Sequence, residues 1–275
     1  MRLAMIQMDV VHDKQQNIAH ASALLRQAAG EGIDLAVLPE MFCCPYSNRF
    51  FRAYGEEAGG EAWSALSALA RELGIYLVGG SMPELCEGNV YNTSYVFDRA
   101  GQCIAKHRKA HLFDINVEGG QKFQESAVLS PGERVTVFDT EFGKIGLCIC
   151  FDFRFQELSK VMGDLGAQLI VVPAAFNMTT GPAHWDLLFR QRAVDNQLFT
   201  MGVAPARNEG EEYVSYANSI LVDPWGTVLV RGGTGEEILM AEIDFAQNDA
   251  IRRQLPIRSA RREELYIRKG ERDQA

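Results

Sequence analysis

The sequence lacks the features that would direct the protein to a membrane or to a nucleic acid. None of its apolar runs reaches the roughly 18 residues that a membrane-spanning helix requires. Positive charge is also scarce, because the 275 residues carry a net charge of −9 at pH 7. Nucleic acids and anionic lipids bind to basic surfaces, so we expect neither kind of partner.

Patterns typical of metal sites and of exported proteins are missing as well. Six cysteines are present, but Cys43-Cys44 and the pair Cys148 and Cys150 lack the spacing of a zinc ribbon. Met1 is followed directly by the strand-like RLAMIQMD, without the basic and long apolar parts of a secretory leader. These absences predict a cytoplasmic protein without structural zinc, whose cysteines remain reduced thiols.

An internal duplication is the first feature that the sequence does contain. Four segments of the first half have counterparts in the second half, in the same order: 2–9 with 144–152, 32–40 with 166–174, 73–80 with 197–204, and 92–106 with 218–230. In the last pair, Asp98 and Asp223 each open a D-x-x-G turn, and the two aspartates are 125 positions apart. The apolar pattern of these segments predicts buried strands.

Helical patterns lie between these strands. Pro182 predicts the first turn of one helix, with Thr179 or Thr180 near its cap. Apolar residues recur at helical spacing over residues 14–29 and 62–73, and in the second half over 154–165 and 183–197.

Two such halves predict a layered α/β fold. Each half supplies a sheet that helices cover on one side, so the two sheets can pack against each other. We predict a single domain over residues 1–275, built as a four-layer α-β-β-α sandwich with internal duplication. The charged, arginine-rich tail over 244–275 is expected to wrap a neighbour or to fray.

Three side chains of catalytic type follow predicted strands. Glu40 comes after DLAVLP, Lys109 ends CIAKHRK, and Cys150 ends KIGLCIC. In layered α/β folds, sites are built at the ends of strands. Each residue also has a simpler interpretation: a capping or salt-bridging carboxylate, a solvated lysine in a basic cluster, and a small buried hydrophobe.

Together these residue types form a workable catalytic set. A free thiol has a pKa near about 8.5, and the junction of a strand with a helix N-terminus at Cys150 favours thiolate. A carboxylate such as Glu40 can accept the thiol proton, while the Lys109 ammonium and the backbone N–H of Phe151 can stabilise an oxyanion. Such a site attacks an amide or nitrile carbon and forms a thioester.

The surroundings of these residues resemble the nitrilase superfamily of carbon–nitrogen hydrolases. The matching segments are LPEMF at Glu40, HRKAHLFD at Lys109 and CICFDFRFQEL at Cys150, and the resemblance extends from residue 2 to 266. HRKAHLFDI, FNMTTGPAHW and APARN are most similar to the omega-amidase branch. The resemblance implies the duplicated four-layer sandwich, no metal or other cofactor, and a homodimer or larger homo-oligomer.

The resemblance also implies a role for each residue that matches the motifs. Glu40 is then the general base, Lys109 the oxyanion donor and Cys150 the nucleophile. Glu125 in KFQES matches a second glutamate that positions the substrate and the hydrolytic water. Without the resemblance, Glu125 would be interpreted as a solvated loop residue. The nearby Gly119-Gly120 predicts that the loop over 114–124 is mobile and closes on the ligand.

Omega-amidases hydrolyse the terminal amide of α-keto acids such as 2-oxoglutaramate, so this branch implies a site for a carboxylate. We expect Arg154 to bind it, since a guanidinium can hold a carboxylate through two hydrogen bonds. The alternative is an ion pair of Arg154 with Asp152 or Glu157. Further residues expected to line the pocket are Tyr46, Phe151, Phe176 and Thr179, although Tyr46 could equally be a packed aromatic.

The sequence departs from the branch at two positions beside the nucleophile. Phe151 stands where a tyrosine is common, and Cys148 stands where a glycine is frequent. Sister activities therefore stay open: a deaminated-glutathione amidase, an N-carbamoyl amino acid hydrolase and a nitrilase use the same thiol. A catalytically silent scaffold that binds a protein partner is an alternative of another class. A redox or metal-binding role of the cysteines is the remaining alternative.

Overall fold

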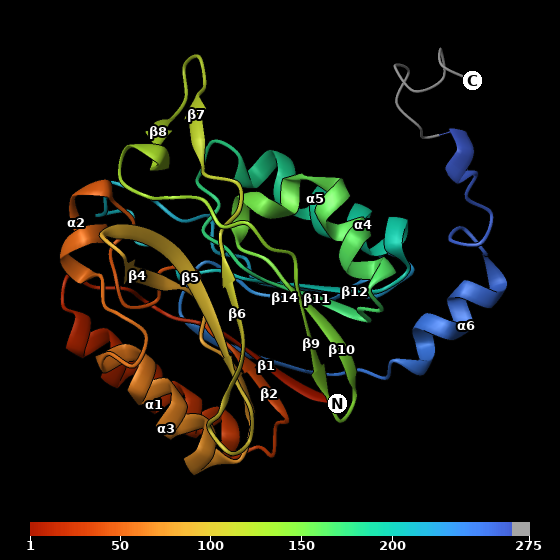
Figure 1. Ribbon diagram of the computed structural model, residues 1–275, viewed down its shortest axis with the longest axis horizontal. Helices are drawn as coiled ribbons and strands as arrows, with labels where there is room; N and C mark the ends of the chain where they lie inside the picture. Colours follow the sequence, from red (N-terminus) through yellow and green to blue (C-terminus); the bar gives the residue numbers. More distant parts are fainter. Residues whose placement is uncertain (266–275) are drawn as a thin grey trace.

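The computed structural model describes residues 1–265 of the chain. Figure 1 shows four layers, in which two sheets pack face to face and helices cover their outer sides. Helices α1 (Lys14–Ala29) and α3 (Glu61–Leu73) cover the first sheet, and α4 (Gln156–Asp164) and α5 (Gly181–Asn196) cover the second. The predicted four-layer α-β-β-α sandwich is confirmed.

The first sheet has the strand order β15-β1-β2-β3-β5-β4, with β6 also paired to β5. Its strands are β1 (Arg2–Gln7), β2 (Leu35–Val37), β3 (Tyr76–Val78), β4 (Met82–Cys86), β5 (Asn89–Phe97), β6 (Cys103–Arg108) and β15 (Glu237–Glu242). Strands β1, β2 and β3 run parallel, and the β5–β6 hairpin continues the sheet in the antiparallel direction.

The second sheet repeats this arrangement in the order β14-β13-β12-β11-β10-β9. Its strands are β9 (Thr136–Thr140), β10 (Gly143–Leu147), β11 (Leu169–Pro173), β12 (Phe199–Val203), β13 (Ile220–Val222) and β14 (Val228–Arg231). Strands β10, β11 and β12 are parallel, and the β13–β14 hairpin follows. The duplicated segments thus occupy equivalent places. Strand β15 lies antiparallel beside β1 as β9 lies beside β10.

The alternation of side chains along the strands explains the layers. In β1, Leu3 and Met5 are buried between the two sheets, whereas Ala4 and Ile6 are buried beneath α1 and α3. Strand β11 shows the same alternation. Leu169 and Val171 face the first sheet, whereas Ile170 and Val172 pack under α4 and α5. Strands apolar on both faces, as these are, belong in the interior of a layered fold.

Several elements were not predicted from periodicity, since each is too short to show it. They are α2 (Asn48–Tyr54), β7 (Asp114–Asn116), β8 (Lys122–Gln124), and the 3-10 helices η1 (Glu125–Ala127) and η2 (Cys150–Arg154). Helix α4 begins two residues later than predicted, because Cys150–Arg154 forms η2 first. The predicted loop over 114–124 contains the β7–β8 hairpin, which pairs Asp114 with Gln124.

The tail contains helix α6 (Ala246–Gln254) and the short η3 (Glu263–Leu265). Its first part is anchored to the same chain. Asn248 Nδ2 donates to the carbonyl of Gln168 at 2.8 Å, and Arg258 Nη2 donates to the carbonyl of Gly163 at 2.9 Å. The predicted tail also includes 266–275, which lie outside the described residues. Among residues 1–265, no helix has the length and apolarity to cross a membrane.

Candidate active site

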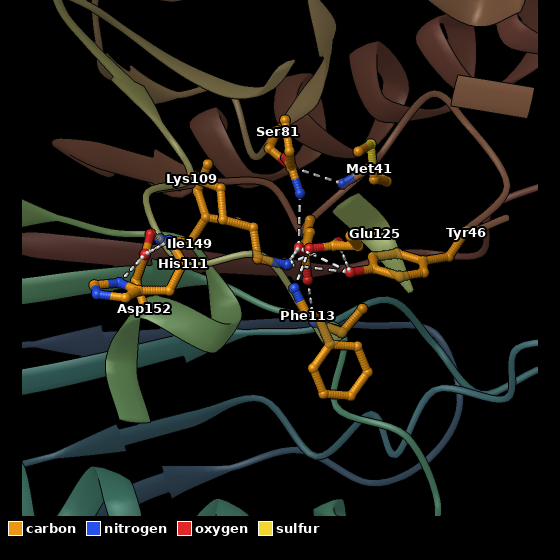
Figure 2. Close-up of polar contacts among 12 residues, drawn as sticks. Met41, Tyr46, Ser81, Lys109, His111, Phe113, Glu125, Ile149 and Asp152 are labelled. Atoms are coloured by element: carbon orange, nitrogen blue, oxygen red, sulfur yellow. Dashed lines mark hydrogen bonds and ion pairs between the residues drawn. The ribbon is translucent and has the colours of Figure 1, made fainter. Parts of the chain in front are cut away.

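The ends of three strands bring the candidate residues to one place. Glu40 follows β2, Lys109 comes directly after β6, and Cys150 follows β10 as the first residue of η2. Glu125 begins η1 after the β7–β8 hairpin. Figure 2 shows the side chains of Lys109, Glu125 and Tyr46 pointing toward one another from these separate elements.

Lys109 is the centre of a buried ionic cluster. Its Nζ lies 3.0 Å from Glu40 Oε1, 2.9 Å from Glu125 Oε1 and 3.2 Å from Tyr46 Oη. All three ionic side chains are buried, so the interpretations of Lys109 and Glu125 as solvated residues are wrong. Burial opposes the charge on Lys109, but the two carboxylates outweigh it and raise the pKa of the ammonium. The two carboxylates thus favour the charged form of Lys109.

Glu40 accepts hydrogen bonds from two further groups. Asn92 Nδ2 donates to Oε1 at 2.8 Å, and the backbone N–H of Ala175 donates to Oε2 at 2.8 Å. Burial raises the pKa of Glu40 and the Glu125 carboxylate adds to the increase, which Lys109 only partly offsets. A carboxylate with a raised pKa is a stronger base.

Glu125 is fixed by three donors. The backbone N–H of Phe113 donates to Oε2 at 2.6 Å, and the Tyr46 hydroxyl donates to Oε1 at 2.5 Å, beside Lys109. With both oxygens held, this carboxylate has little freedom to move. It orients the Lys109 ammonium and the Tyr46 hydroxyl between itself and Glu40.

Cys150 sits at a strained point of the backbone. Its φ is +45°, a left-handed value that is uncommon for residues other than glycine and is often found at functional sites. The side chain is buried, with 3% exposed. Burial raises the pKa of the thiol well above its usual value, the Glu40 carboxylate raises it further, and Lys109 lowers it. Burial and the Glu40 carboxylate thus oppose the favourable dipole of the strand–helix junction, so the thiol depends on a base to lose its proton.

Asp152 joins the Lys109 segment to the Cys150 segment. Its carboxylate is fully buried and accepts from His107 Nε2 at 2.9 Å and from His111 Nδ1 at 2.8 Å. It also accepts from the backbone N–H groups of Ala110 at 3.1 Å, His111 at 2.8 Å and Ile149 at 3.1 Å (Figure 2). Despite burial, these donors hold its pKa well below the usual range. Asp152 is a positioning residue that spaces the lysine from the thiol.

We expect Asp152→Asn to lower the free energy of unfolding by about 2–4 kcal/mol, because the new NH₂ group would face buried donors. The kcat for amide hydrolysis should fall while KM changes little. Denaturant unfolding and steady-state kinetics measure the two effects. The difference in stability should be present above pH 4 and shrink below it, since a carboxylate with a lowered pKa stabilises the fold only while ionised.

Glu84→Gln is the matched control, because Glu84 is a buried carboxylate that pairs with Lys106 and Arg108 away from the thiol. It should cost stability without lowering kcat. An Asp152→Asn enzyme with normal kcat would contradict the positioning role.

Arg154 lies within an aromatic setting close to the thiol. Its guanidinium carbon is 4.6 Å from the ring centre of Phe176 and 5.8 Å from that of Phe151, and Nη1 contacts His184 Nδ1 at 3.0 Å. Within residues 1–265 no carboxylate forms an ion pair with Arg154, so the alternative of a structural ion pair is wrong. Burial lowers the pKa of Arg154, whereas the Cys150 thiolate would raise it. A guanidinium without a carboxylate partner can receive an anion.

Thr179 is exposed and contacts the β7–β8 hairpin rather than the ionic cluster. Its Oγ1 accepts from the backbone N–H of Gln121 at 3.3 Å. Its role toward substrate stays a prediction, as do those of Phe151 and Phe176. The hydroxyl of Tyr46 donates to Glu125 and its ring packs against Phe51, while its role toward substrate stays a prediction.

Tyr213 is a site residue that sequence reasoning missed. Its ring centre lies 4.3 Å from that of Tyr46, and its hydroxyl donates to the carbonyl of Ala175. Burial and the charges of Cys150 and Glu40 raise its pKa. No motif marks its loop, and Asn92 lies in a strand, NVYNTSYVF, that mixes polar and apolar residues and so does not single it out. Within the described part of the chain, no three His, Cys, Asp or Glu side chains gather as metal ligands.

Comparison with known proteins supports a hydrolase, as the geometry of the cluster does. The model of the carbon–nitrogen hydrolase family matches residues 2–253. The chain belongs to this family. Omega-amidase NIT2 of Mus musculus is 48% identical to this carbon–nitrogen hydrolase over 265 residues, which cover 96% of each chain. The human omega-amidase NIT2 is 46% identical with the same coverage. The protein is thus an amidase-type hydrolase.

Solved structures agree with this assignment. Nit3 of Saccharomyces cerevisiae, a member of branch 10 of the nitrilase superfamily, superposes with a TM-score of 0.88 at 41% identity, covering 95% of this hydrolase and 96% of Nit3. A glutamate-to-glutamine mutant of the amidase from Nesterenkonia sp. AN1 has a TM-score of 0.77 at 26% identity, covering 97% and 95%. That structure shows the acetamide moiety of fluoroacetamide covalently added at the active-site cysteine.

Proposed function

We propose that this carbon–nitrogen hydrolase cleaves the terminal amide of a small carboxylate-bearing substrate such as 2-oxoglutaramate and releases ammonia. The observation that carries the proposal is the buried Lys109 ammonium between the Glu40 and Glu125 carboxylates, with Cys150 beside Glu40. The identity to omega-amidases over nearly the full chain supports the choice of substrate.

Acylation begins with the protonated thiol. As Sγ of Cys150 attacks the amide carbon, Glu40 accepts the thiol proton, so a poorly acidic thiol becomes a nucleophile only when substrate is present. The charge of Lys109 and the backbone N–H of Phe151, in the first turn of η2, stabilise the oxyanion. The carbon–nitrogen bond then breaks, and the nitrogen leaves as ammonia with the proton from Glu40.

In deacylation Glu40 again acts first as a base and then as an acid, with water as the nucleophile and Sγ as the leaving group. Water attacks the thioester carbon while Glu40 takes one of its protons, and that proton returns to Sγ as the carbon–sulfur bond breaks. Glu125 keeps Lys109 and Tyr46 in place through both steps. No cofactor takes part in this scheme.

The substrate carboxylate is assigned to Arg154. Phe176 and Phe151 lie against the guanidinium and limit its motion, and His184 holds Nη1 through its ring nitrogen. Tyr46 and Thr179 complete the proposed substrate-binding set. An amide with a carboxylate at its far end would thus place its reacting carbon at the thiol.

Arg154→Ala is expected to raise KM for carboxylate-bearing amides by about 10- to 100-fold, the equivalent of a charged hydrogen bond of about 1.5–3 kcal/mol. The KM for a neutral aliphatic amide should change little and serves as the control. Steady-state ammonia release measures both. Equal losses on the two substrates would exclude Arg154 as the carboxylate ligand.

A substrate panel tests the proposed function. Ammonia release is measured with 2-oxoglutaramate, glutamine, an aliphatic nitrile and an N-carbamoyl amino acid. Activity confined to 2-oxoglutaramate supports the proposal. Preference for a nitrile or a carbamoyl substrate would assign the enzyme to a sister branch, with the same thiol chemistry.

We further propose a homodimer or larger homo-oligomer, on the basis of the resemblance to the family, and a cytoplasmic protein, on the basis of its six free cysteines. Sedimentation velocity of the purified protein tests the assembly. A single species at the monomer mass of 30.6 kDa would contradict it.

A further inference from the structure

A separate pocket borders Glu40 but not Arg154. It is open to solvent and is formed mainly by the loops after β1, β2 and β12. Glu40, Ser47 and Ala175 are among its lining residues, whereas Arg154, Phe151 and Phe176 are not. A substrate carboxylate bound at Arg154 therefore lies outside this pocket.

Two tyrosines connect the pocket with the catalytic groups. Tyr46 and Tyr213 both line it, with their ring centres 4.3 Å apart. The Tyr46 hydroxyl contacts Glu40 at 3.4 Å, and Tyr213 donates to the carbonyl of Ala175, whose N–H donates to Glu40. A molecule in the pocket thus lies beside two tyrosines that contact Glu40 or its hydrogen-bond donor.

Among the described residues that line the pocket, each basic side chain is paired with a carboxylate. Arg49 is paired with Glu212, and His12 Nε2 lies 2.9 Å from Glu211. Both glutamates belong to the pocket rim. With each basic group compensated, the pocket suits small neutral molecules better than an anionic substrate.

The proposed reaction needs a space for small neutral molecules beside Glu40. After acylation, the acyl group is attached to Cys150 and its carboxylate occupies Arg154, so the substrate side is filled. Ammonia must nevertheless leave, and water must reach Glu40 while the acyl group stays in place. Both are small neutral molecules that form hydrogen bonds.

We propose that this pocket holds the hydrolytic water and provides the exit for ammonia. The inference rests on the proposed function, because it presupposes the thioester at Cys150. Ammonia leaves Glu40 through the pocket with the proton it has received. Water then takes its place, gives one proton to Glu40 and transfers its oxygen to the thioester carbon, and Sγ recovers the proton.

Ser47→Trp tests the proposal by filling the pocket. Ser47 is half-buried at the start of α2, and its hydroxyl forms no capping hydrogen bond there. Filling the pocket should slow ammonia release and deacylation, which both follow substrate binding, so kcat should fall by about 10-fold and KM should not rise. Acyl-enzyme should accumulate, which intact-protein mass spectrometry after an acid quench detects.

Ser64→Trp on α3 is the control for added bulk, since Ser64 is exposed and lies outside the pocket. If Ser47→Trp does not fold, Ser47→Leu tests the same effect with a smaller side chain. A raised KM with lowered kcat/KM would show that the pocket takes the substrate, and unchanged kinetics would show that it has no role. Either result overturns the proposal. A wild-type enzyme inactive on every carboxylate amide would instead overturn the proposed function, and this inference with it.

Discussion

Cys150→Ala is expected to lower kcat for amide hydrolysis by on the order of 10⁴- to 10⁶-fold, the loss seen when a covalent nucleophile is removed. No other group of the cluster can replace it, because Glu40, Glu125 and Lys109 are held by one another. Ammonia release under saturating substrate measures the loss.

Cys148→Ala is the matched control. Cys148 is two residues away, equally buried, and its pKa is also raised by burial. Each substitution removes one sulfur atom from the same interior, so both should cost similar stability in thermal unfolding. Only Cys150→Ala should lose activity. An active Cys150→Ala enzyme, or an inactive Cys148→Ala enzyme of normal stability, would contradict the assignment of Cys150 as the nucleophile.

Lys109→Met is expected to lower both activity and stability. Loss of an oxyanion-stabilising charge costs about 10²- to 10³-fold in kcat. The substitution also leaves the Glu40 and Glu125 carboxylates buried without their cation, and breaking a buried ion pair costs about 3–5 kcal/mol. Lys106→Met is the control, since Lys106 pairs with Glu84 and is partly exposed. Chemical denaturation and ammonia release give the two readouts.

The stability of Lys109→Met should also depend on pH in a defined direction. Burial already raises the pKa of Glu40, and without the ammonium the neighbouring Glu125 charge would raise it further. A group whose pKa is raised in the folded state stabilises the fold when protonated, and this contribution is lost as pH rises. The variant should therefore be more stable at pH 6 than at pH 8. A variant as stable as wild type at pH 8 would contradict the description of the cluster.

The layers of the fold could be predicted because each half repeats the same apolar pattern. Strands such as Leu169–Pro173 are apolar at every position, which allows few places other than the interior of a layered α/β fold. The pairing of β15 with β1 could not be predicted. Its sequence EILMAE is a short apolar run between two glutamates, and the pairing depends on how the second half returns to the first.

The candidate site was predictable where residues follow strand ends, as Glu40, Lys109 and Cys150 do. Contacts between distant segments were not, and Asp152 and Tyr213 belong to this class: their partners lie far away in sequence. The effect of burial on the pKa of the thiol could not be predicted for a related reason. Desolvation of Cys150 depends on packing by several loops, whereas the strand–helix junction visible in sequence indicates only the favourable dipole.

The central claim is that the reaction passes through a thioester on Cys150. The most direct measurement is acid-quenched mass spectrometry during turnover of 2-oxoglutaramate, with fragmentation that separates Cys148 from Cys150. We predict an acyl adduct on Cys150, absent from the other five cysteines and lost when substrate is exhausted. Steady ammonia release with an adduct on a different cysteine would contradict the account. So would turnover without any adduct when deacylation is slowed by Ser47→Trp.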